Sequence, residues 1–148
     1  MIPDAIDLAE YIRMNYRKKV VEVGVGSLPQ VALLLKDTME VIITDIKPQP
    51  VFNGKYTGIK YCMDDILNPD ISIYNNASLI YSIRPPVDIQ EAIAKIAKQV
   101  GADLIIRPFG NEKGELGSFY KNHDLMNYKK ARFYLYKDDT GKAANYIY

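Results

Sequence analysis

Two apolar runs, separated by about one helix, constrain this chain more than any other feature. Residues 20–23 lead into Gly24 and Gly26, and residues 41–44 lead into Asp45. β-Branched residues dominate both runs, so each is predicted to be a strand buried on both faces of a sheet. The order of strand, glycine turn, helix, strand and acid is typical of a doubly wound α/β domain that binds a nucleoside-like ligand at the carboxyl edge of its sheet. The pattern indicates where a ligand would bind, but it leaves the reaction open.

Helices and strands continue to alternate along the chain, which predicts a mainly parallel sheet with helices on both faces. Helices are expected at residues 4–16, from near 27 to about 37, and at 87–100. Strands are expected at residues 19–24, 40–45, 59–62, 78–83 and 103–106. The first, second and fourth of these strands should meet at the switch in strand order, which is where ligands bind in such sheets.

Beyond residue 108 the pattern weakens. Residues 110–128 mix glycine, charge and aromatic side chains, and they are expected to form a loop with at most a helical turn. Residues 131–137 alternate as a strand does, and residues 144–148 are expected to pair with them in an antiparallel hairpin. The sequence therefore predicts a single Rossmann-like α/β domain over residues 1–148, doubly wound, with a mainly parallel sheet and an antiparallel C-terminal hairpin.

The composition limits the compartment and the partners. The formal net charge is +1, so no overall field attracts the chain to nucleic acid or to a membrane. No apolar run is long enough for a signal peptide or a membrane span. The single cysteine, Cys62, excludes an intrachain disulfide, which favours a cytoplasmic location. Cys62 is expected to be packed within a strand, the lone His123 has no evident chemical partner, and no metal-ligand spacing occurs.

Residues at successive strand ends are the candidate ligand contacts. Gly24 and Gly26 let the backbone turn sharply and let a ligand approach closely. Asp45 can accept hydrogen bonds from both hydroxyls of a ribose. Asp64 or Asp65, after the third strand, can accept one from an adenine amino group. The alternatives are an ordinary tight turn for the glycines and a helix cap or solvated turn for the acids.

The residues around the glycines also bear on which ligand is bound. Glu22 would be unhelpful beside a pyrophosphate but suits a cationic ligand. Leu28 and Pro29 occupy the region where a dinucleotide fingerprint has a further glycine, which disfavours NAD or FAD. An NAD(P)-binding protein nevertheless remains an alternative, because glycine fingerprints overlap between families.

The Glu-x-Gly-x-Gly motif at residues 22–26, together with Asp45 and Asp64, resembles the S-adenosylmethionine site of Rossmann-like (class I) methyltransferases. The resemblance implies that the glycine loop lies under the methionine part of the cofactor and that Asp45 holds the ribose. It also implies that Asp64 or Asp65 holds the adenine amino group. The helix before the first strand and the terminal hairpin fit the same family.

An arginine followed by proline ends both the fourth and the fifth expected strand, at Arg84 and Arg107. In amino-directed methyltransferases an Asn or Asp at the place of Arg84 accepts the substrate amine, whereas a guanidinium has no free acceptor. We expect the two arginines to clamp an anionic substrate; the alternative is that each pairs with an acid such as Glu22 or Asp103 and braces the edge. These paired ends also make the chain similar to a small archaeal family of uncharacterised Rossmann-like proteins, which implies no particular activity.

The strand at 131–137 suggests a second kind of partner. Its inward positions are Ala131, Phe133 and Leu135, and the outward ones are Lys130, Arg132, Tyr134 and Tyr136. A basic, aromatic strand face can bind RNA; the alternative is a solvated or oligomeric edge.

Three functions remain open. The first is an S-adenosylmethionine-type binding domain that transfers methyl groups to an anionic acceptor by direct in-line displacement, with catalytic residues unknown. The second is a non-catalytic module that binds a nucleotide or a partner. The third is an NAD(P)-binding Rossmann protein.

Overall fold

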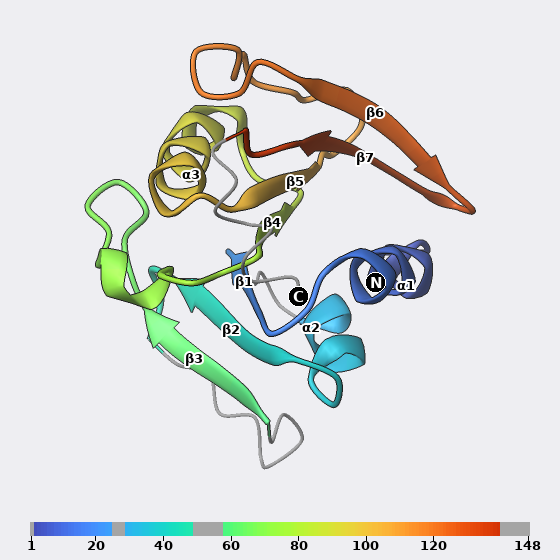
Figure 1. The fold of residues 1–148 in the computed structure, drawn as a ribbon, viewed down its shortest axis with the longest axis horizontal. Coiled ribbons are helices and arrows are strands. Elements are labelled where there is room, and N and C mark those ends of the chain that lie inside the picture. Colours follow the sequence, from blue (N-terminus) through green and yellow to red (C-terminus); the bar gives the residue numbers. More distant parts are fainter. Residues whose placement is uncertain (1, 25–28, 49–57, 140–148) are drawn as a thin grey trace.

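The computed structural model describes residues 2–24, 29–48 and 58–139, which form one twisted sheet with helices on both faces (Figure 1). The helices are α1 (Ala5–Asn15), α2 (Gln30–Leu35), the short 3-10 helix η1 (Ile71–Ile73) and α3 (Val87–Val100). The strands are β1 (Lys19–Val23), β2 (Glu40–Asp45), β3 (Ile59–Met63), β4 (Leu79–Ile83), β5 (Asp103–Arg107), β6 (His123–Tyr128) and β7 (Ala131–Tyr136).

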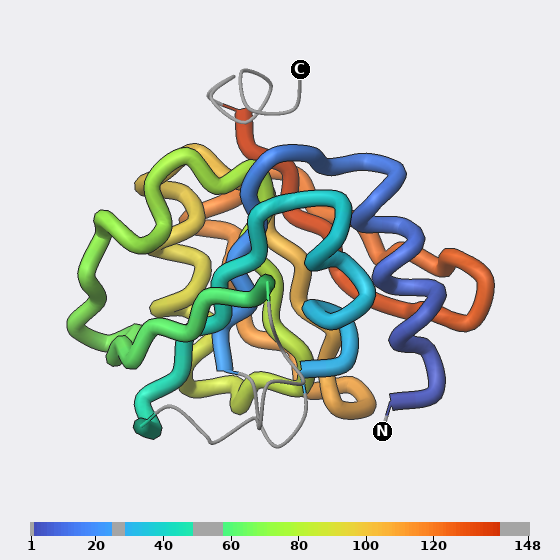
Figure 2. Tube along the Cα trace, turned by 90° about the horizontal axis from the view of Figure 1, so that it is seen from below, coloured from blue at the N-terminus to red at the C-terminus, as the bar shows by residue number. Residues whose placement is uncertain are grey.

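The strand order is β3-β2-β1-β4-β5-β7-β6. The first five strands along the chain are parallel, whereas β7 runs antiparallel to both β5 and β6. Because β1 lies between β2 and β4, the strand order reverses there, as the sequence predicted. The parallel strands all end at one edge of the sheet, which is the lower edge in Figure 2. This arrangement confirms the predicted doubly wound, mainly parallel α/β fold.

The two faces of the sheet bury separate apolar clusters. On one face, α1 and α2 cover Val20, Ile43, Tyr81 and their neighbours. On the other face, α3 covers Val21 and Ile80, together with the segment between β3 and β4 that contains η1 and the segment between β5 and β6. Regular helices therefore cover only part of this second face, which leaves room for grooves beside α3.

Helix α3 follows directly from its sequence. Its apolar positions recur at helical spacing, with Ile93, Ile96 and Val100 buried, and a left-handed Gly101 with a φ of 75° ends it at the residue the sequence predicted. The result is a rigid helix that starts at the carboxyl edge of the sheet.

The sequence suggests Asp4 as the cap of the first helix and a capping box of Ser27 and Gln30 at the start of the second. Asp4 occupies the N-cap position of α1, but its side chain caps no amide. Pro29 is the N-cap of α2, and that helix ends at Leu35. Gln30 does not take part in a capping box, because its Oε1 accepts the backbone N–H of Ile2 at 3.0 Å. The expected cap Ser27 lies outside the described residues.

The C-terminal hairpin forms with a different partner from the one expected. β7 pairs with β6, within the stretch predicted to be a loop, through a turn at Lys129 and Lys130. β6 was missed because it has no clear apolar alternation and because its turn contains no glycine, although Lys129 has a φ of 53°. Residues 144–148 lie outside the described residues, and β5 and β6 already occupy both edges of β7.

Candidate functional site

A cavity of about 180 Å³ lies at the carboxyl ends of β1, β2 and β3. It is lined by Val23, Gly24, Thr44, Asp45, Ile46, Asp64, Asp65, Ile66, Leu67 and Ile89. The structure thus brings Gly24, Asp45 and both candidate adenine contacts together, as their positions at successive strand ends predicted. Of the apolar wall, the sequence suggests only Ile66, which follows Asp65 and could pack against an adenine ring. Ile89 was indistinguishable from the core stripe of α3, and nothing in the sequence marks Ile46 or Leu67.

Gly24 forms one wall of this cavity. Its φ is 75°, a left-handed conformation that glycine adopts without strain. Its N–H donates to the carbonyl of Thr44 at 2.7 Å, which ties the start of the loop to β2. Among the described residues, no atom lies within 4 Å of a Cβ built at this position, so these residues leave space above the glycine for a ligand. Gly26 lies outside the described residues.

Asp45 is the last residue of β2 and is partly exposed. Its Oδ1 accepts the backbone N–H of Lys47 at 3.2 Å. A carboxylate has about four lone-pair sites and can accept several donors at once. The strand end and the local turn together orient the carboxylate along the rim of the cavity.

Asp64 and Asp65 are held by different contacts. Asp64 accepts the hydroxyl of Tyr74 at 2.7 Å and the N–H of Asp70 at 2.9 Å, one on each oxygen. Burial raises the pKa of Tyr74, and the bond to Asp64 adds to the rise, so this hydroxyl stays protonated as a donor. The carboxylate of Asp65 accepts the local N–H of Leu67 at 3.0 Å. Asp64 is therefore the more rigid of the two acceptors.

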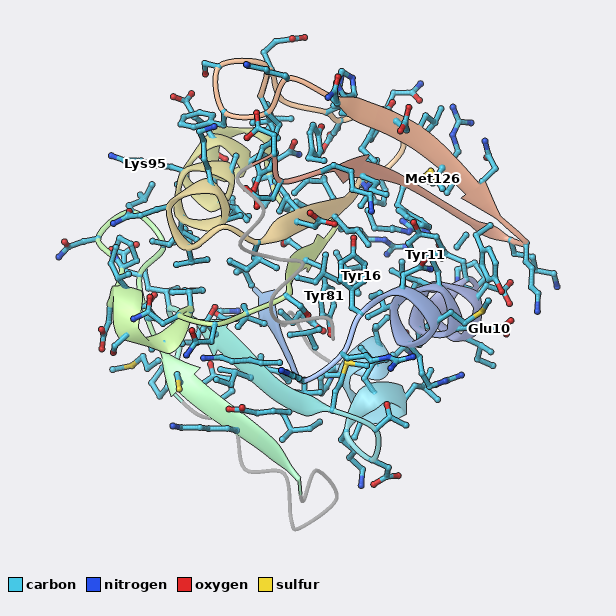
Figure 3. The ribbon with its side chains drawn as sticks, viewed as in Figure 1. Glu10, Tyr11, Tyr16, Tyr81, Lys95 and Met126 are labelled. Carbon is cyan, nitrogen blue, oxygen red and sulfur yellow. The ribbon has the colours of Figure 1, made fainter. Side chains whose placement is uncertain are left out.

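Glu22 does not line the described part of the cavity. It lies on β1, two residues before Gly24, on the face of the sheet that α1 and α2 cover, and its side chain is 2% exposed. Its register partner on β4 is Tyr81, which points into the same layer between the sheet and α1 (Figure 3). Within the described chain, Glu22 Oε1 and the Tyr81 hydroxyl form no hydrogen bond of regular geometry. Burial raises the pKa of Glu22 to about 8, so near neutral pH the carboxyl is mainly protonated.

Arg107 forms an ion pair with Asp4, which is neither of the acids expected from the sequence. Its Nη2 and Nε donate to the two carboxylate oxygens of Asp4, at 2.8 and 3.2 Å, and its Nη1 donates to the carbonyl of Pro108. Asp4 is buried and Arg107 is largely so, so this bidentate pair fastens the start of α1 to the end of β5. The geometry fits the bracing alternative for Arg107, with Asp4 in place of Glu22 or Asp103.

Arg84 has a different environment. It is exposed, follows β4 with a φ of 54°, and its Cζ lies 5.3 Å from the ring centroid of Phe109. A shared clamp would require Arg107 to leave Asp4, so anion binding in this region stays a prediction for Arg84. A non-glycine residue in the left-handed region is strained, and such strain often accompanies functional positions.

The remaining predicted residues have simple environments. Cys62 is half-buried within β3. His123 is exposed, stacks on Tyr136 with ring centroids 5.4 Å apart, and has its Nε2 3.4 Å from Lys113 Nζ. Tyr136 is buried, not outward, because the chain between β5 and β6 folds over it and places Tyr120 against its ring.

Three further features bear on where a ligand could bind. A larger groove of about 560 Å³ runs between α3 and residues 66–71, and it shares Ile66 and Leu67 with the cavity. Across residues 2–24, 29–48 and 58–139, no three His, Cys, Asp or Glu side chains cluster as metal ligands. Of the helices in the same ranges, none has the length and apolar character needed to cross a membrane.

Solved structures of methyltransferases share this fold. An RNA methyltransferase from Salinibacter ruber, in complex with S-adenosyl-L-homocysteine, superposes with a TM-score of 0.65 at 12% identity. That match covers 95% of this chain and 94% of the other. A TehB-like SAM-dependent methyltransferase from Corynebacterium glutamicum gives 0.64 at 13% identity, over 91% and 88% of the two chains. At such low identity the likeness establishes the methyltransferase-like Rossmann fold.

Sequence relatives are much more similar. A UPF0146 protein of Archaeoglobus fulgidus is 40% identical over 136 residues, which cover 91% of this chain and 96% of that protein. A UPF0146 protein of Methanocaldococcus jannaschii is 39% identical over 128 residues, or 86% and 90% of the two chains. The model of the "Uncharacterised protein family (UPF0146)" matches residues 5–138. The resemblance to a small archaeal family is thereby confirmed, and the chain belongs to the UPF0146 family.

Proposed function

We propose that this protein binds S-adenosylmethionine or S-adenosylhomocysteine in the cavity at the ends of β1, β2 and β3. One observation carries the proposal: Gly24, Asp45, Asp64 and Asp65, from three successive strand ends, line a single cavity. In this proposal Asp45 binds the ribose hydroxyls, and Asp64 or Asp65 binds the adenine amino group. The methyltransferase-like fold supports the same assignment.

The residues present fit an adenosyl ligand. Isoleucine and leucine side chains give the cavity apolar walls against which an adenine ring can pack, and the carboxylates stand at its rim. The open space above Gly24 suits close approach of the methionine part, and we assign the same role to Gly26. Glu22, buried and mainly protonated, is a poor partner for a ligand cation.

Methyl transfer to an anionic acceptor is the activity that we propose for this site. When bound, S-adenosylmethionine supplies a methyl group on a sulfonium that leaves readily, so alignment of the acceptor does most of the work. Arg84 is exposed at the end of β4, the strand next to β1, and its guanidinium can orient a phosphate or carboxylate. It cannot remove a proton, so an acceptor that is already ionised is favoured.

Binding without catalysis is the second candidate. The observation that favours it is the environment of the carboxylates: Asp64 already accepts two protein hydrogen bonds and Asp65 accepts one. Such groups hold a ligand well but are poorly placed to act as a base. An NAD(P)-binding function is the third candidate. It predicts that NAD or NADP binds more tightly than S-adenosylmethionine does.

Calorimetric titration with S-adenosylmethionine, S-adenosylhomocysteine, NAD, NADP and ATP separates these functions. S-adenosylmethionine and S-adenosylhomocysteine should both bind. In a parallel NMR titration they should shift the amide resonances of residues 22–24 and of Asp45. Saturating ligand that moves none of these resonances would refute the site, and tighter binding of NAD would favour the third function. Release of S-adenosylhomocysteine from S-adenosylmethionine in the presence of anionic acceptors distinguishes transfer from binding alone.

A further inference from the structure

A second groove lies at the same edge of the sheet, where β5 ends and β7 begins. It has a volume of about 370 Å³ and runs between the start of α1, the chain after β5 and the β6–β7 hairpin. Figure 2 shows the start of α1 beside the chain that follows β5 at this edge. Because β7 is antiparallel to β5, the first residues of β7 lie at the carboxyl edge of the parallel strands. The cavity proposed to bind the adenosyl ligand, here called the adenosyl cavity, lies at the same edge. We call the second groove the basic groove and define it by Arg107, Leu125, Lys130, Arg132 and Tyr134.

The charge of the basic groove is only partly balanced by acids of the described residues, among which Asp7 accepts the backbone N–H of Lys130 at 3.0 Å. Asp4 neutralises Arg107. Lys130 and Arg132 are exposed, and neither side chain forms an ion pair with another residue of the described ranges. Although the whole chain has a formal net charge of only +1, these two cations are concentrated at one end of β7. The groove therefore attracts anions locally, over a distance of about a Debye length.

Aromatic side chains lie along the same edge. Tyr134 is half-buried in the basic groove, and Lys113 Nζ lies 5.1 Å from its ring centroid. Phe109, after β5, is 56% exposed and has Arg84 over its ring. Since β4 and β5 separate β1 from β7 in the sheet, Arg84 and Phe109 stand between the adenosyl cavity and the basic groove.

We propose that the basic groove and Phe109 bind single-stranded nucleic acid. Lys130 and Arg132 contact phosphates, and Phe109 and Tyr134 offer ring faces to bases. A small phosphorylated molecule would need its cations close together, whereas here cations and rings are spread over the ends of β4, β5 and β7. That distribution matches a strand, because charges and stacking groups alternate along its length. The further step, that this strand is the methyl acceptor, rests on the proposed function.

Fluorescence anisotropy tests the proposal with the whole chain. The probes are labelled single-stranded RNA and DNA of one mixed sequence, about 12 nucleotides long, within the site sizes seen for such proteins. Binding should weaken as salt rises from about 50 to about 200 mM, through loss of counterion release. Lys130→Ala and Arg132→Ala should each lower the affinity about twofold to fivefold, as for exposed ion pairs. Each should also reduce the slope of log affinity against log salt by about 0.7.

Two matched variants separate phosphate contact from general charge. Lys60→Ala removes an exposed lysine from β3, at the opposite edge of the sheet, and should leave the affinity unchanged. Phe109→Ala should lower the affinity about fivefold or more without changing the salt slope, because it removes stacking and no charge. All four side chains are exposed, so circular dichroism should show that each variant remains folded.

Three results would overturn the proposal. They are an absence of saturable binding at the lowest salt, an equal loss of affinity in Lys60→Ala and Lys130→Ala, and competition by polyglutamate as effective as that by unlabelled RNA. Preference for RNA over DNA, or the reverse, identifies which strand binds. S-adenosylhomocysteine titration of the Lys130→Ala/Arg132→Ala double variant keeps the two proposals apart. If the wild-type chain binds nucleic acid but no adenosyl ligand, only the proposed function is refuted. If it binds the adenosyl ligand but no nucleic acid, only the nucleic-acid surface is refuted.

Discussion

The two halves of the carboxyl edge of the sheet differ in charge and in how their polar groups are held. At the ends of β1, β2 and β3, the carboxylates of Asp45, Asp64 and Asp65 accept hydrogen bonds from the protein around a small cavity. At the ends of β4, β5 and β7, cations predominate, and Lys130 and Arg132 have no ion-pair partner in the described chain. The carboxylates of the acidic half are held by protein donors, whereas the cations of the basic half are exposed to water.

This difference shows how one sheet edge can serve two kinds of ligand. Carboxylates fixed by protein donors pay little entropy when they bind hydroxyl or amino groups of a small molecule. Solvated lysine and arginine side chains can adapt to phosphates at variable positions, at the cost of ordering on binding. Arg107 is the exception in the basic half, because Asp4 holds it as firmly as the acids of the other half are held.

The largest expected effect concerns that exception. Asp4→Ala should lower the free energy of unfolding by about 3 to 5 kcal/mol, since it leaves the largely buried Arg107 without its counter-charge. Urea denaturation measures the change. Asp37→Ala is the control, because it removes an exposed acid that pairs with Lys36 at 3.5 Å and should cost less than about 1 kcal/mol. Equal losses in the two variants would show that Arg107 is not a brace.

The next effect concerns Glu22, beneath the acidic half. Burial raises its pKa from 4.5 to about 8, so the folded state holds a proton that the unfolded chain releases between these values. The free energy of unfolding should therefore fall as pH rises through this window, by up to about 1.4 kcal/mol per pH unit.

The Glu22→Gln variant has no such proton. Between about pH 6 and about pH 8 the wild type should lose about 2 to 3 kcal/mol relative to it, and the difference should level off above the folded pKa. Denaturation at several pH values gives both curves. Curves that stay parallel across this range would mean that Glu22 is ionised in the folded protein.

Asp45 tests the acidic half directly. Asp45→Ala should weaken S-adenosylhomocysteine binding by about 1.5 to 3 kcal/mol, the scale of hydrogen bonds to a charged group. Calorimetry measures the change, and Asp37→Ala, which removes a carboxylate far from the cavity, should leave the affinity unaltered. An unchanged affinity in Asp45→Ala would remove the ribose role from this residue.

The smallest effect concerns Arg84, at the border between the halves. Its φ of 54° is strained for any residue with a Cβ, so Arg84→Gly should be more stable than Arg84→Ala by about 1 kcal/mol. Thermal denaturation of the pair tests this. If alanine proves as stable as glycine, the backbone there is not left-handed in solution, and the strain that we associate with Arg84 is absent.

Much of the acidic half followed from local sequence. The strands at residues 19–23 and 40–45 were predicted within a residue, because β-branched runs report burial on both faces. Asp45 and Asp64 could be assigned to one edge without a structure, because parallel strands end on the same side of their sheet. Their convergence with Gly24 on one cavity then required only the reversal of strand order at β1.

The sequence by itself thus determined the fold class, the switch point and the acidic rim, because these depend on short-range periodicity and strand direction. Tertiary structure alone decided the rest. The Arg107–Asp4 pair joins residues 103 positions apart, and the Tyr74–Asp64 bond and the burial of Glu22 depend on packing across elements. β6 was visible only as the partner of β7. Contacts of this kind arise where distant segments meet, and such meetings leave no periodic trace along the chain.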